Sequence, residues 1–233
     1  MNIGLFGYGK MGQMIEQIAQ SRGHSIVAKV DLDTQEVDYK NIDVAIDFST
    51  PDAAFNNITT CFKNNIPVIS GTTGWLSNYD KAVGICNETN GAFIYASNFS
   101  LGVNVFFELN SYLAKMMSNL NQYNVEMEEI HHTQKLDAPS GTAITLADGI
   151  IENTEYIGWE LDTSGKKKIP IISKREGSVP GTHSISYEST VDNIEIKHTA
   201  HNREGFALGA VIAAEWIQGK TGVFSMKDVL NLN

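Results

Sequence analysis

Near its beginning the chain carries an apolar segment that runs into a glycine-rich turn, Ile3-Gly4-Leu5-Phe6-Gly7-Tyr8-Gly9-Lys10-Met11-Gly12. Apolar residues then recur at helical spacing as far as Ala19, which predicts a helix directly after the turn. In the Gly-x-Gly-x-x-Gly pattern, Gly7 permits the tight turn and Gly9 lets the backbone approach a pyrophosphate. Gly12 allows the helix to pack closely on the strand. This order of strand, glycine turn and helix predicts a site for the phosphates of a dinucleotide.

An acidic residue at the end of the next predicted strand supports this interpretation. Asp31 follows the strand Ser25–Val30 and stands 19 residues after the last glycine of the turn. A carboxylate there can accept hydrogen bonds from both ribose hydroxyls. Because Leu32 follows, no arginine is present to pair with a 2′-phosphate. NADH is therefore favoured over NADPH, although Lys10 or Lys29 could still reach a phosphate. The alternative is a glycine-rich turn that binds no ligand.

Strand-like and helix-like segments alternate through the first hundred residues. Further strands are predicted at Val44–Phe48, Ile66–Ser70 and Ala92–Ala96, and a helix begins at Pro51 with Thr50 as its N-cap. Repeated units of this length predict a parallel sheet with helices on both faces.

Two loops follow strands of this predicted sheet. They are Gly71-Thr72-Thr73-Gly74 and Ala96-Ser97-Asn98-Phe99. Because loops at the carboxyl ends of parallel strands line the ligand crevice, both are predicted to contact the cofactor. The alternative for each loop is an ordinary turn.

The pattern changes after Asn98. Predicted elements are a long helix over Leu101–Met117, a strand with one solvent-facing side over Tyr123–Ile130, a helix from Gly141, a turn at Lys166–Lys168, strands at Ile169–Ser173, Thr182–Thr190 and Asn193–His201, and a helix over Phe206–Gln218. The last two strands are predicted to form a hairpin. We therefore expect a Rossmann-like α/β domain, a doubly wound parallel sheet, over residues 1–98 completed by 205–233. An α+β substrate domain with a mixed sheet is expected over residues 99–204.

Composition limits the classes of partner. Lys and Arg number 17 against 27 Asp and Glu, a formal net charge of −10, which excludes a broadly basic surface for nucleic acid. An anionic substrate would therefore need a local positive site. Cys61 and Cys86 are too few for a disulfide scaffold and suggest reduced thiols in a cytoplasmic protein. The chain has no apolar run of the roughly 18 residues that a membrane span needs.

The stretch richest in chemistry is Glu129-Ile130-His131-His132-Thr133-Gln134-Lys135-Leu136-Asp137-Ala138-Pro139-Ser140-Gly141-Thr142-Ala143. A histidine suits proton transfer near neutral pH, and a lysine supplies a positive charge or a proton. A helix that starts with Ser140-Gly141-Thr142 offers hydroxyl and backbone N–H groups to a carboxylate. The combination predicts a site for a small dicarboxylate. A zinc site is not expected, because no cysteine or further histidine has suitable spacing. The alternative is a solvated polar loop.

These residues resemble the 4-hydroxy-tetrahydrodipicolinate reductase family, also called dihydrodipicolinate reductase. Its signature, E-x-H-H-x-x-K-x-D-A-P-S-G-T-A, is intact from Glu129 to Ala143. The resemblance continues at Lys10-Met11-Gly12, Asp47-Phe48-Ser49, Gly71–Gly74, Ser97–Asn104, Arg175–His183 and His198–Ala210.

The resemblance implies the roles of individual residues. His131 would be the proton donor or acceptor and Lys135 a proton donor, while His132, Gly141, Thr142 and Thr73 would bind the substrate, together with Ser140 at the helix start. Residues implied to bind the cofactor are Gly7, Tyr8, Gly9, Lys10, Met11, Gly12, Asp31, Gly71, Thr72, Thr73, Ala96, Ser97, Asn98, Phe99 and Arg203. The implied reaction is the NAD(P)H-dependent reduction of hydroxytetrahydrodipicolinate in the diaminopimelate route to lysine. The implied assembly is a homotetramer formed through the sheet of the second domain.

Two other functions remain open at this stage. One is another two-domain NAD(P)-dependent dehydrogenase that acts on an imine or amino acid, although such an enzyme has less need of both the paired histidines and the Pro-Ser-Gly-Thr helix start. The other is a non-catalytic dinucleotide-binding sensor, which would not need to retain His131 and Lys135.

Overall fold

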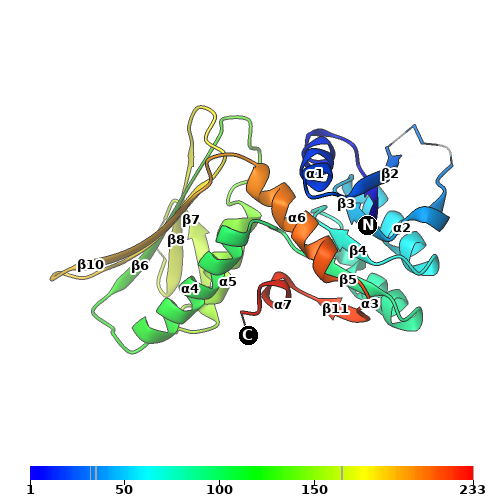
Figure 1. Cartoon of the computed structure of the whole chain (residues 1–233). Helices are drawn as coiled ribbons and strands as arrows, with labels where there is room; N and C mark the ends of the chain where they lie inside the picture. The colour runs from blue at the N-terminus through cyan, green and yellow to red at the C-terminus, as the bar shows by residue number, and fades with distance from the viewer. Residues whose placement is uncertain (32, 35, 164, 233) are drawn as a thin grey trace. The chain divides into compact units, whose positions relative to one another are not determined.

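The chain forms two compact units. The computed structural model describes residues 1–31, 33–34, 36–163 and 165–232. One unit comprises Met1–Leu101 and Glu204–Asn233, and the other comprises Gly102–Arg203. The first unit is therefore built from two separate stretches of the chain, coloured blue to cyan and orange to red in Figure 1.

The first unit contains a parallel sheet in the strand order β11-β5-β4-β3-β1-β2. Its strands are β1 (Asn2–Phe6), β2 (Ser25–Val30), β3 (Val44–Asp47), β4 (Val68–Ser70), β5 (Ala92–Tyr95) and β11 (Gly222–Phe224). The chain moves outward from β1 to β2 and then crosses to β3 on the other side of β1. Ligands of doubly wound sheets bind at this kind of reversal in strand order.

Helices cover both faces of this sheet. They are α1 (Lys10–Ser21), α2 (Pro51–Lys63), α3 (Tyr79–Glu88), α6 (Glu204–Trp216) and α7 (Met226–Leu230), with single 3₁₀ turns at Tyr39–Asn41 and Leu76–Asn78. Alternate strand residues enter separate cores: Leu5 and Ile46 pack with α1 and α6, whereas Phe6 and Ala45 pack with α2 and α3. This two-sided burial explains the continuous apolar runs of the strands.

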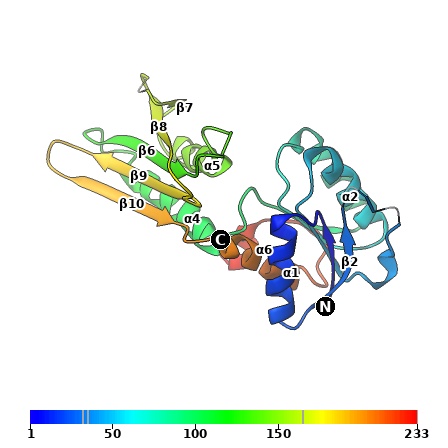
Figure 2. The same ribbon diagram turned by 90° about the horizontal axis from the view of Figure 1, so that it is seen from above.

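The second unit contains a mixed sheet in the order β10-β9-β6-β8-β7. Its elements are α4 (Leu101–Met117, which begins one residue before the unit), β6 (Asn124–His131), α5 (Gly141–Ile151), β7 (Gly158–Leu161), β8 (Lys168–Arg175), β9 (Thr182–Glu188) and β10 (Asn193–Thr199). Strand β8 is parallel to β6 and β7, while β9 is antiparallel to β6 and β10. Figure 2 shows β9 and β10 side by side as the predicted hairpin.

One face of the mixed sheet is buried by α4 and α5. Leu113 and Met117 of α4 and Leu146 of α5 share a core with Met127 and Ile185 of the sheet. The parallel Rossmann-like sheet and the α+β unit with a mixed sheet together confirm the predicted fold class. Among the described helices, none is long and apolar enough to cross a membrane.

Some elements differ from the sequence prediction. The strands β7 and β11 and the helices α3 and α7 were not predicted. Each of the two strands is short, four and three residues, so neither is long enough to show a clear alternation of polar and apolar residues. The predicted turn at Lys166–Lys168 is wrong at its last residue, because Lys168 begins β8 and forms an ion pair with Glu160 at 2.5 Å. Helix α2 does start at Pro51, but Thr50 makes no side-chain capping bond.

Candidate active site

The second unit buries two ionisable side chains at the carboxyl end of β6. Residues alternate along this strand, so that Glu129 and His131 share the buried face with Met127, while Glu126 and Glu128 lie on the other face. The side chain of Glu129 is fully buried, and His131 is 7% exposed. A buried acid beside a buried histidine is unusual in a core and is typical of a functional site.

Glu129 is surrounded by hydrogen-bond donors. Its carboxylate accepts the backbone N–H of Ser140 at 3.1 and 3.2 Å and the hydroxyl of Ser173 at 2.6 Å. The Arg175 guanidinium lies 3.5 Å away. Burial alone would raise the pKa of Glu129, but the contacts with His183, Ser140 and Ser173 outweigh burial and hold the pKa well below its usual range. Glu129 is therefore ionised at neutral pH.

His131 lies between Glu129 and Gly181. Its Nδ1 is 3.5 Å from Glu129 Oε2 and has no hydrogen-bond partner in the described part of the chain. Its Nε2 would be 3.2 Å from a Cβ placed on Gly181, so the glycine leaves room beside that nitrogen. Burial lowers the pKa of His131 to about 4, although the charge of Glu129 opposes this shift. The imidazole is therefore neutral at neutral pH in the protein without ligand.

His183 completes a buried cluster with these two residues. Its ring lies edge-on to that of His131, with centroids 5.1 Å apart, and its Nε2 is 3.7 Å from Glu129 Oε2. Glu129, His131 and His183 each offer one potential metal-ligating atom, all within 4.8 Å of one another. Because serine donors and Arg175 already surround the carboxylate, we interpret the cluster as a hydrogen-bonding network rather than a metal site.

The loop between β6 and α5 carries the other positive groups. The Lys135 Nζ forms a bidentate contact with the Asp137 carboxylate, at 2.8 Å to each oxygen. Arg175 holds this loop from β8 by donating to the carbonyl oxygens of Lys135, at 3.2 Å, and Asp137, at 2.5 Å. His132 is half-buried, with Nε2 3.3 Å from Arg203 Nη2. Arg203 thus lies beside a predicted substrate residue, and its predicted contact with the cofactor stays a prediction.

Helix α5 begins at the predicted position. Ser140 is its N-cap, and the Ser140 Oγ accepts the N–H of Ala143 at 3.2 Å and lies 3.2 Å from His183 Nε2. This hydroxyl is therefore already engaged within the protein. Gly141 is exposed, with no atom within 4 Å of an added Cβ, and Thr142 is half-buried. The accessible part of the helix start is formed by these two residues, where the helix dipole favours an anion.

The glycine turn of the first unit has the geometry expected for a phosphate-binding loop. Gly7 has a φ of +90°, and a Cβ there would lie 2.2 Å from the Phe48 carbonyl oxygen. A Cβ on Gly12 would lie 2.3 Å from the Gly7 carbonyl oxygen, whereas a Cβ on Gly9 would meet nothing within 4 Å. Helix α1 follows directly, and Gly9 provides no side-chain cap. The open space at Gly9 and the uncapped helix start fit a pyrophosphate.

A buried aspartate organises the neighbouring strand ends. Asp47 ends β3 and accepts hydrogen bonds from the hydroxyls of Ser49 at 2.6 Å, Ser70 at 2.9 Å and Thr72 at 2.7 Å. Burial raises the pKa of Asp47 despite these hydrogen bonds. The Thr72 hydroxyl also accepts the N–H of Ser49 at 2.9 Å, so it serves the loop structure. Thr73, the next residue of the loop, is exposed.

The remaining predicted cofactor residues lie around the same sheet. In the loop after β5, Ala96 is half-buried, Ser97 is exposed, and Asn98 Oδ1 accepts the N–H of Ser100 at 2.9 Å. Phe99 is buried, with its ring centroid 5.9 Å from that of Phe48. Asp31 is exposed directly after β2, as predicted.

The two lysines considered for a cofactor phosphate, Lys10 and Lys29, differ in their surroundings. Lys29 donates to the Tyr8 hydroxyl at 2.9 Å and forms an ion pair with Glu16 at 2.8 Å, and the Tyr8 hydroxyl itself donates to Glu16. Lys10 is exposed at the start of α1, next to the half-buried Met11. Leu32, on which the predicted coenzyme preference depends, lies outside the described residues.

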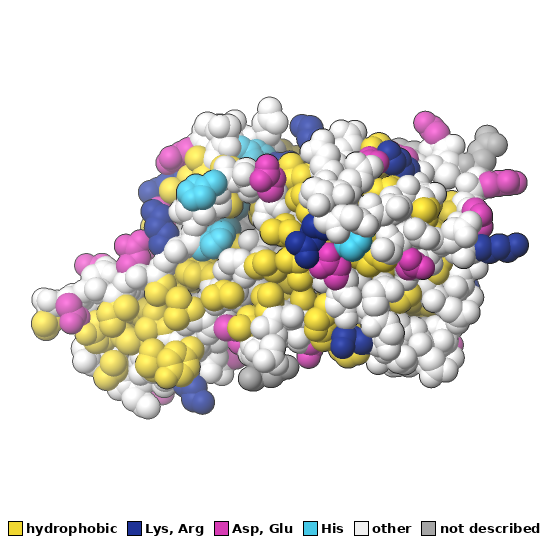
Figure 3. All heavy atoms as spheres, in the orientation of Figure 1, with side chains coloured by type: hydrophobic (Ala, Val, Ile, Leu, Met, Phe, Trp, Pro, Cys, Tyr) yellow, Lys and Arg dark blue, Asp and Glu magenta, His cyan; other side chains and the backbone are white. Residues whose placement is uncertain are grey.

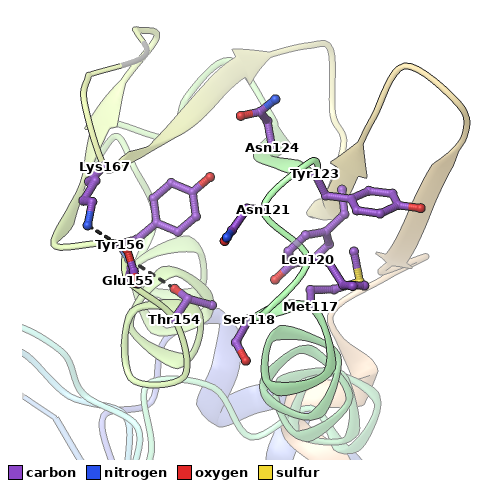
Figure 4. A pocket seen from close by; sticks show the side chains of 11 residues that line it. Met117, Ser118, Leu120, Asn121, Tyr123, Asn124, Thr154, Glu155, Tyr156 and Lys167 are labelled. Atoms are coloured by element: carbon purple, nitrogen blue, oxygen red, sulfur yellow. Dashed lines mark hydrogen bonds and ion pairs between the residues drawn. The ribbon is translucent and has the colours of Figure 1, made fainter.

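A separate cavity of about 260 Å³ lies in the second unit, away from these groups. Its lining includes Tyr123, Asn121 and Tyr156, and Figure 4 shows the Lys167–Glu155 ion pair at its side. No predicted site residue lines it.

Sequence reasoning assigned no role to Glu129, His183 or Asp47. Glu129 could have been placed beside His131, because residues two apart share a face of a strand. His183 pairs with Glu129 across β9 and β6, a long-range register that the sequence pattern does not specify.

Comparisons with known proteins agree with the features of both units. Residues 1–99 match the sequence model described as "Dihydrodipicolinate reductase, N-terminus", and residues 102–230 match "Dihydrodipicolinate reductase, C-terminus". A 4-hydroxy-tetrahydrodipicolinate reductase from Christiangramia forsetii is 63% identical over 99% of this chain and 98% of its own length. One from Thermosipho africanus is 34% identical over 99% and 98%.

A solved structure supports the fold independently. The dipicolinate-bound dihydrodipicolinate reductase from Paenisporosarcina sp. TG-14 is similar with a TM-score of 0.78 at 22% sequence identity, over 97% of each chain. At this identity the similarity concerns the fold alone. The sequence matches extend over both units, and the chain belongs to the dihydrodipicolinate reductase family.

Proposed function

We propose that this chain reduces 4-hydroxy-2,3,4,5-tetrahydrodipicolinate to tetrahydrodipicolinate, with loss of water, at the expense of NAD(P)H. The reaction belongs to the diaminopimelate route to lysine. The observation that carries the proposal is the full-length match to a reductase of this name at 63% identity, with the signature Glu129–Ala143 intact.

The second unit supplies groups for a dicarboxylate. The exposed start of α5, at Gly141 and Thr142, receives one carboxylate through backbone N–H groups and the helix dipole. His132 and Lys135 provide positive or hydrogen-bonding groups for the other carboxylate. Thr73 of the first unit is exposed and is proposed to assist. Holding both carboxylates fixes the orientation of the substrate ring, which lowers the entropic part of the barrier.

Proton delivery is assigned to His131 and Lys135. His131 is neutral without ligand because burial lowers its pKa to about 4. A dianionic substrate bound nearby would raise that pKa, since an opposite charge favours the imidazolium. The Lys135 Nζ is held by the Asp137 carboxylate at 2.8 Å. The two residues can therefore deliver a proton to the imine side of the reduced ring.

The first unit is proposed to hold the dinucleotide. Gly7, Gly9 and Gly12 form the phosphate loop, and Asp31 accepts from the ribose. The neighbouring contacts in this unit are proposed for Tyr8, Lys10, Met11, Gly71, Thr72, Thr73, Ala96, Ser97, Asn98 and Phe99. Arg203, which belongs to the second unit, is proposed as a further cofactor contact. The bound cofactor supplies the hydride. NADH is favoured, because Asp31 suits a free ribose hydroxyl and the charge of Lys29 is paired with Glu16.

We also propose a cytoplasmic homotetramer. The cytoplasmic location is supported by Cys61 and Cys86, which are both free and buried, and burial raises the pKa of Cys86 to about 11. Association is supported by exposed apolar side chains on α4, including Leu109, Tyr112 and Met116. Figure 3 shows apolar side chains gathered over α4. Assembly through the mixed sheet rests on the family resemblance.

An assay with freshly generated substrate tests the proposal. The purified protein should oxidise NADH, and to a different extent NADPH, as measured by loss of reduced-cofactor absorbance. His131→Ala should lower kcat by about 10²–10⁴-fold, the usual contribution of a general acid, with little change in the dissociation constant of NADH. Absence of turnover with either cofactor, while NADH still binds, would favour a dinucleotide-binding sensor. Turnover only of amino acids or other imines would favour a different dehydrogenase.

A further inference from the structure

We propose that Glu129 is the positioning residue and counter-ion of His131, and that the same carboxylate ties the proton-transferring ring to the substrate-binding start of α5. The inference rests on the proposed function, because it concerns a residue that acts through His131 in the same site. Glu129 itself has no exposed surface, so it acts on His131 and α5 rather than on the substrate.

The contacts of Glu129 join three elements of the second unit. From β6 its carboxylate reaches the backbone N–H of Ser140, which caps α5, at 3.1 and 3.2 Å. From β8 it receives the Ser173 hydroxyl at 2.6 Å and lies 3.5 Å from the Arg175 guanidinium. The carboxylate thus has a fixed position, set by groups that do not take part in proton transfer.

The orphaned nitrogen of His131 points to the role of this carboxylate. Nδ1 is buried without a hydrogen-bond partner in the described residues, and Glu129 Oε2 is 3.5 Å away. A normal N–H···O hydrogen bond is about 2.9 Å long, so a small movement would complete one. Hydrogen bonds between catalytic groups are often long before the substrate binds and shorten in the complex. With Nδ1–H directed at Glu129, Nε2 is left for the substrate.

Among the described groups that act on the charge of His131, Glu129 is the one that carries a negative charge. Those groups are Glu129 on β6, His183 on β9, Arg175 on β8 and Lys135 in the following loop. The contacts of the last three disfavour an imidazolium at this position, whereas Glu129 favours it. Replacing Glu129 with a neutral residue would therefore remove the charge that favours the imidazolium, so protonation of the buried His131 ring would require a lower pH.

The variant Glu129→Gln separates charge from shape. Glutamine keeps an oxygen that can accept the Ser140 N–H, so the KM for the dicarboxylate should change less than threefold. The alkaline limb of the pH profile of kcat should move to lower pH by about one unit, which is a tenfold change in the ratio of protonated to neutral His131. At a fixed alkaline pH the kcat of the variant should therefore be lower than that of the wild type. The matched control is Glu128→Gln. Glu128 lies on the opposite face of the same strand and pairs with Lys174 at 2.5 Å, so its profile should match the wild type.

The conservative variant Glu129→Asp provides a rescue test. It keeps the negative charge, so its alkaline limb should stay near that of the wild type even where kcat is lower. An equal shift in Glu129→Asp and Glu129→Gln, or a Glu129→Gln profile identical to that of the wild type, would overturn the proposal.

A measurement on the wild-type protein does not depend on activity or on the stability of a variant. Nitrogen NMR of the neutral His131 ring should show the proton on Nδ1, whereas free imidazole side chains favour Nε2–H. A proton on Nε2 would overturn the positioning role. If the wild-type protein showed Nδ1–H but did not turn over the substrate, the proposed function would fail and the structural assignment of Glu129 would stand.

Discussion

At the scale of single residues, the site is controlled by buried charges. Glu129 and His131 occupy adjacent positions on the buried face of β6, and burial acts on both. Burial disfavours the charged form of each. Glu129 receives enough hydrogen bonds to stay ionised, whereas the charge of Glu129 alone does not offset the burial of His131. The result is an ionised carboxylate beside a neutral imidazole. The imidazole can accept a proton when a dianionic substrate binds.

This arrangement predicts that the free energy of unfolding decreases as the pH is lowered. An unfolded histidine has a pKa near 6.5, and the folded His131 has a pKa of about 4. Between these values the unfolded chain binds a proton that the folded chain excludes, so stability falls as the pH falls. The contribution is about 2 kcal/mol between pH 7 and pH 5. Urea denaturation at the two pH values measures it.

The expected control uses another histidine. His131→Gln should lose less stability on acidification than the wild type, because glutamine binds no proton. His201→Gln changes an exposed ring and should leave the pH dependence near that of the wild type. If His131→Gln and the wild type lost stability in parallel, the buried neutral ring would not be the cause. Glu129 does not contribute to the difference between pH 7 and pH 5. Because its pKa is lowered in the folded protein, the stability that it contributes is lost only at a pH below this range.

Sequence reasoning singled out the residues proposed to react but not the residues that hold them in place. His131, His132 and Lys135 lie close together in the chain, so their proximity is visible in the sequence. Asp47 and the hydroxyls that it binds come from the ends of different strands, and Glu129 meets His183 through strand pairing. Such contacts depend on register and topology, which short-range patterns do not specify.

At the scale of elements, close helix packing fixes the first unit. Helix α6 lies so near the loop after β5 that a Cβ on Gly209 would be 1.8 Å from the Phe99 carbonyl oxygen. Gly209→Ala should therefore destabilise the protein by about 3 kcal/mol, because the backbone cannot move aside cheaply. The change in the free energy of unfolding can be measured by denaturant titration.

Gly84 offers a matched control for this substitution. It also lies within a helix, α3, but an added Cβ would meet nothing within 4 Å. Gly84→Ala should stabilise the protein by roughly 0.5–1 kcal/mol, because alanine has the higher helix propensity. A loss of stability in Gly84→Ala as large as in Gly209→Ala would show that the close contact with Phe99 is not responsible.

The long helix α4 was predictable from its pattern, whereas the short strands β7 and β11 were not. The helix predicted over Leu101–Met117 is observed with the same bounds. The strands β7 and β11 are stabilised by pairing with β8 and β5 rather than by a pattern of their own. Tertiary pairing therefore decides their conformation, and the local sequence carries little information about it.

At the scale of the whole molecule, we expect NADH to stabilise mainly the first unit, which is proposed to bind it. NADH at 100 times its dissociation constant should stabilise the protein by about 2.7 kcal/mol through mass action. Hydrogen exchange should show the increased protection in residues of the first unit, around β1, α1 and β2. Thermal unfolding with and without NADH measures the total effect.

Asp31→Ala tests the origin of that stabilisation. The variant should bind NADH more weakly, and NADH should therefore raise its unfolding temperature less at the same concentration. Its affinity for the dicarboxylate should stay the same, because Asp31 belongs to the first unit, whereas the residues proposed to bind the dicarboxylate, apart from Thr73, belong to the second. Equal weakening of both ligands would mean that Asp31 supports the structure rather than the cofactor.

The order of the chain in the first unit has a consequence for biosynthesis. Helix α6, β11 and α7 are made last, after the whole of the second unit, yet α6 fills the core on one face of the first sheet. While the chain is still being translated, the apolar faces of Ile15 and Ala19 on α1 lack their partner. The residues of the second unit are all made before α6, whereas the nascent first unit exposes apolar surface until α6 is made, and such surface favours aggregation. A chain terminated after residue 203 would therefore contain all of the second unit, while its first unit would lack α6 and the core contacts that α6 provides.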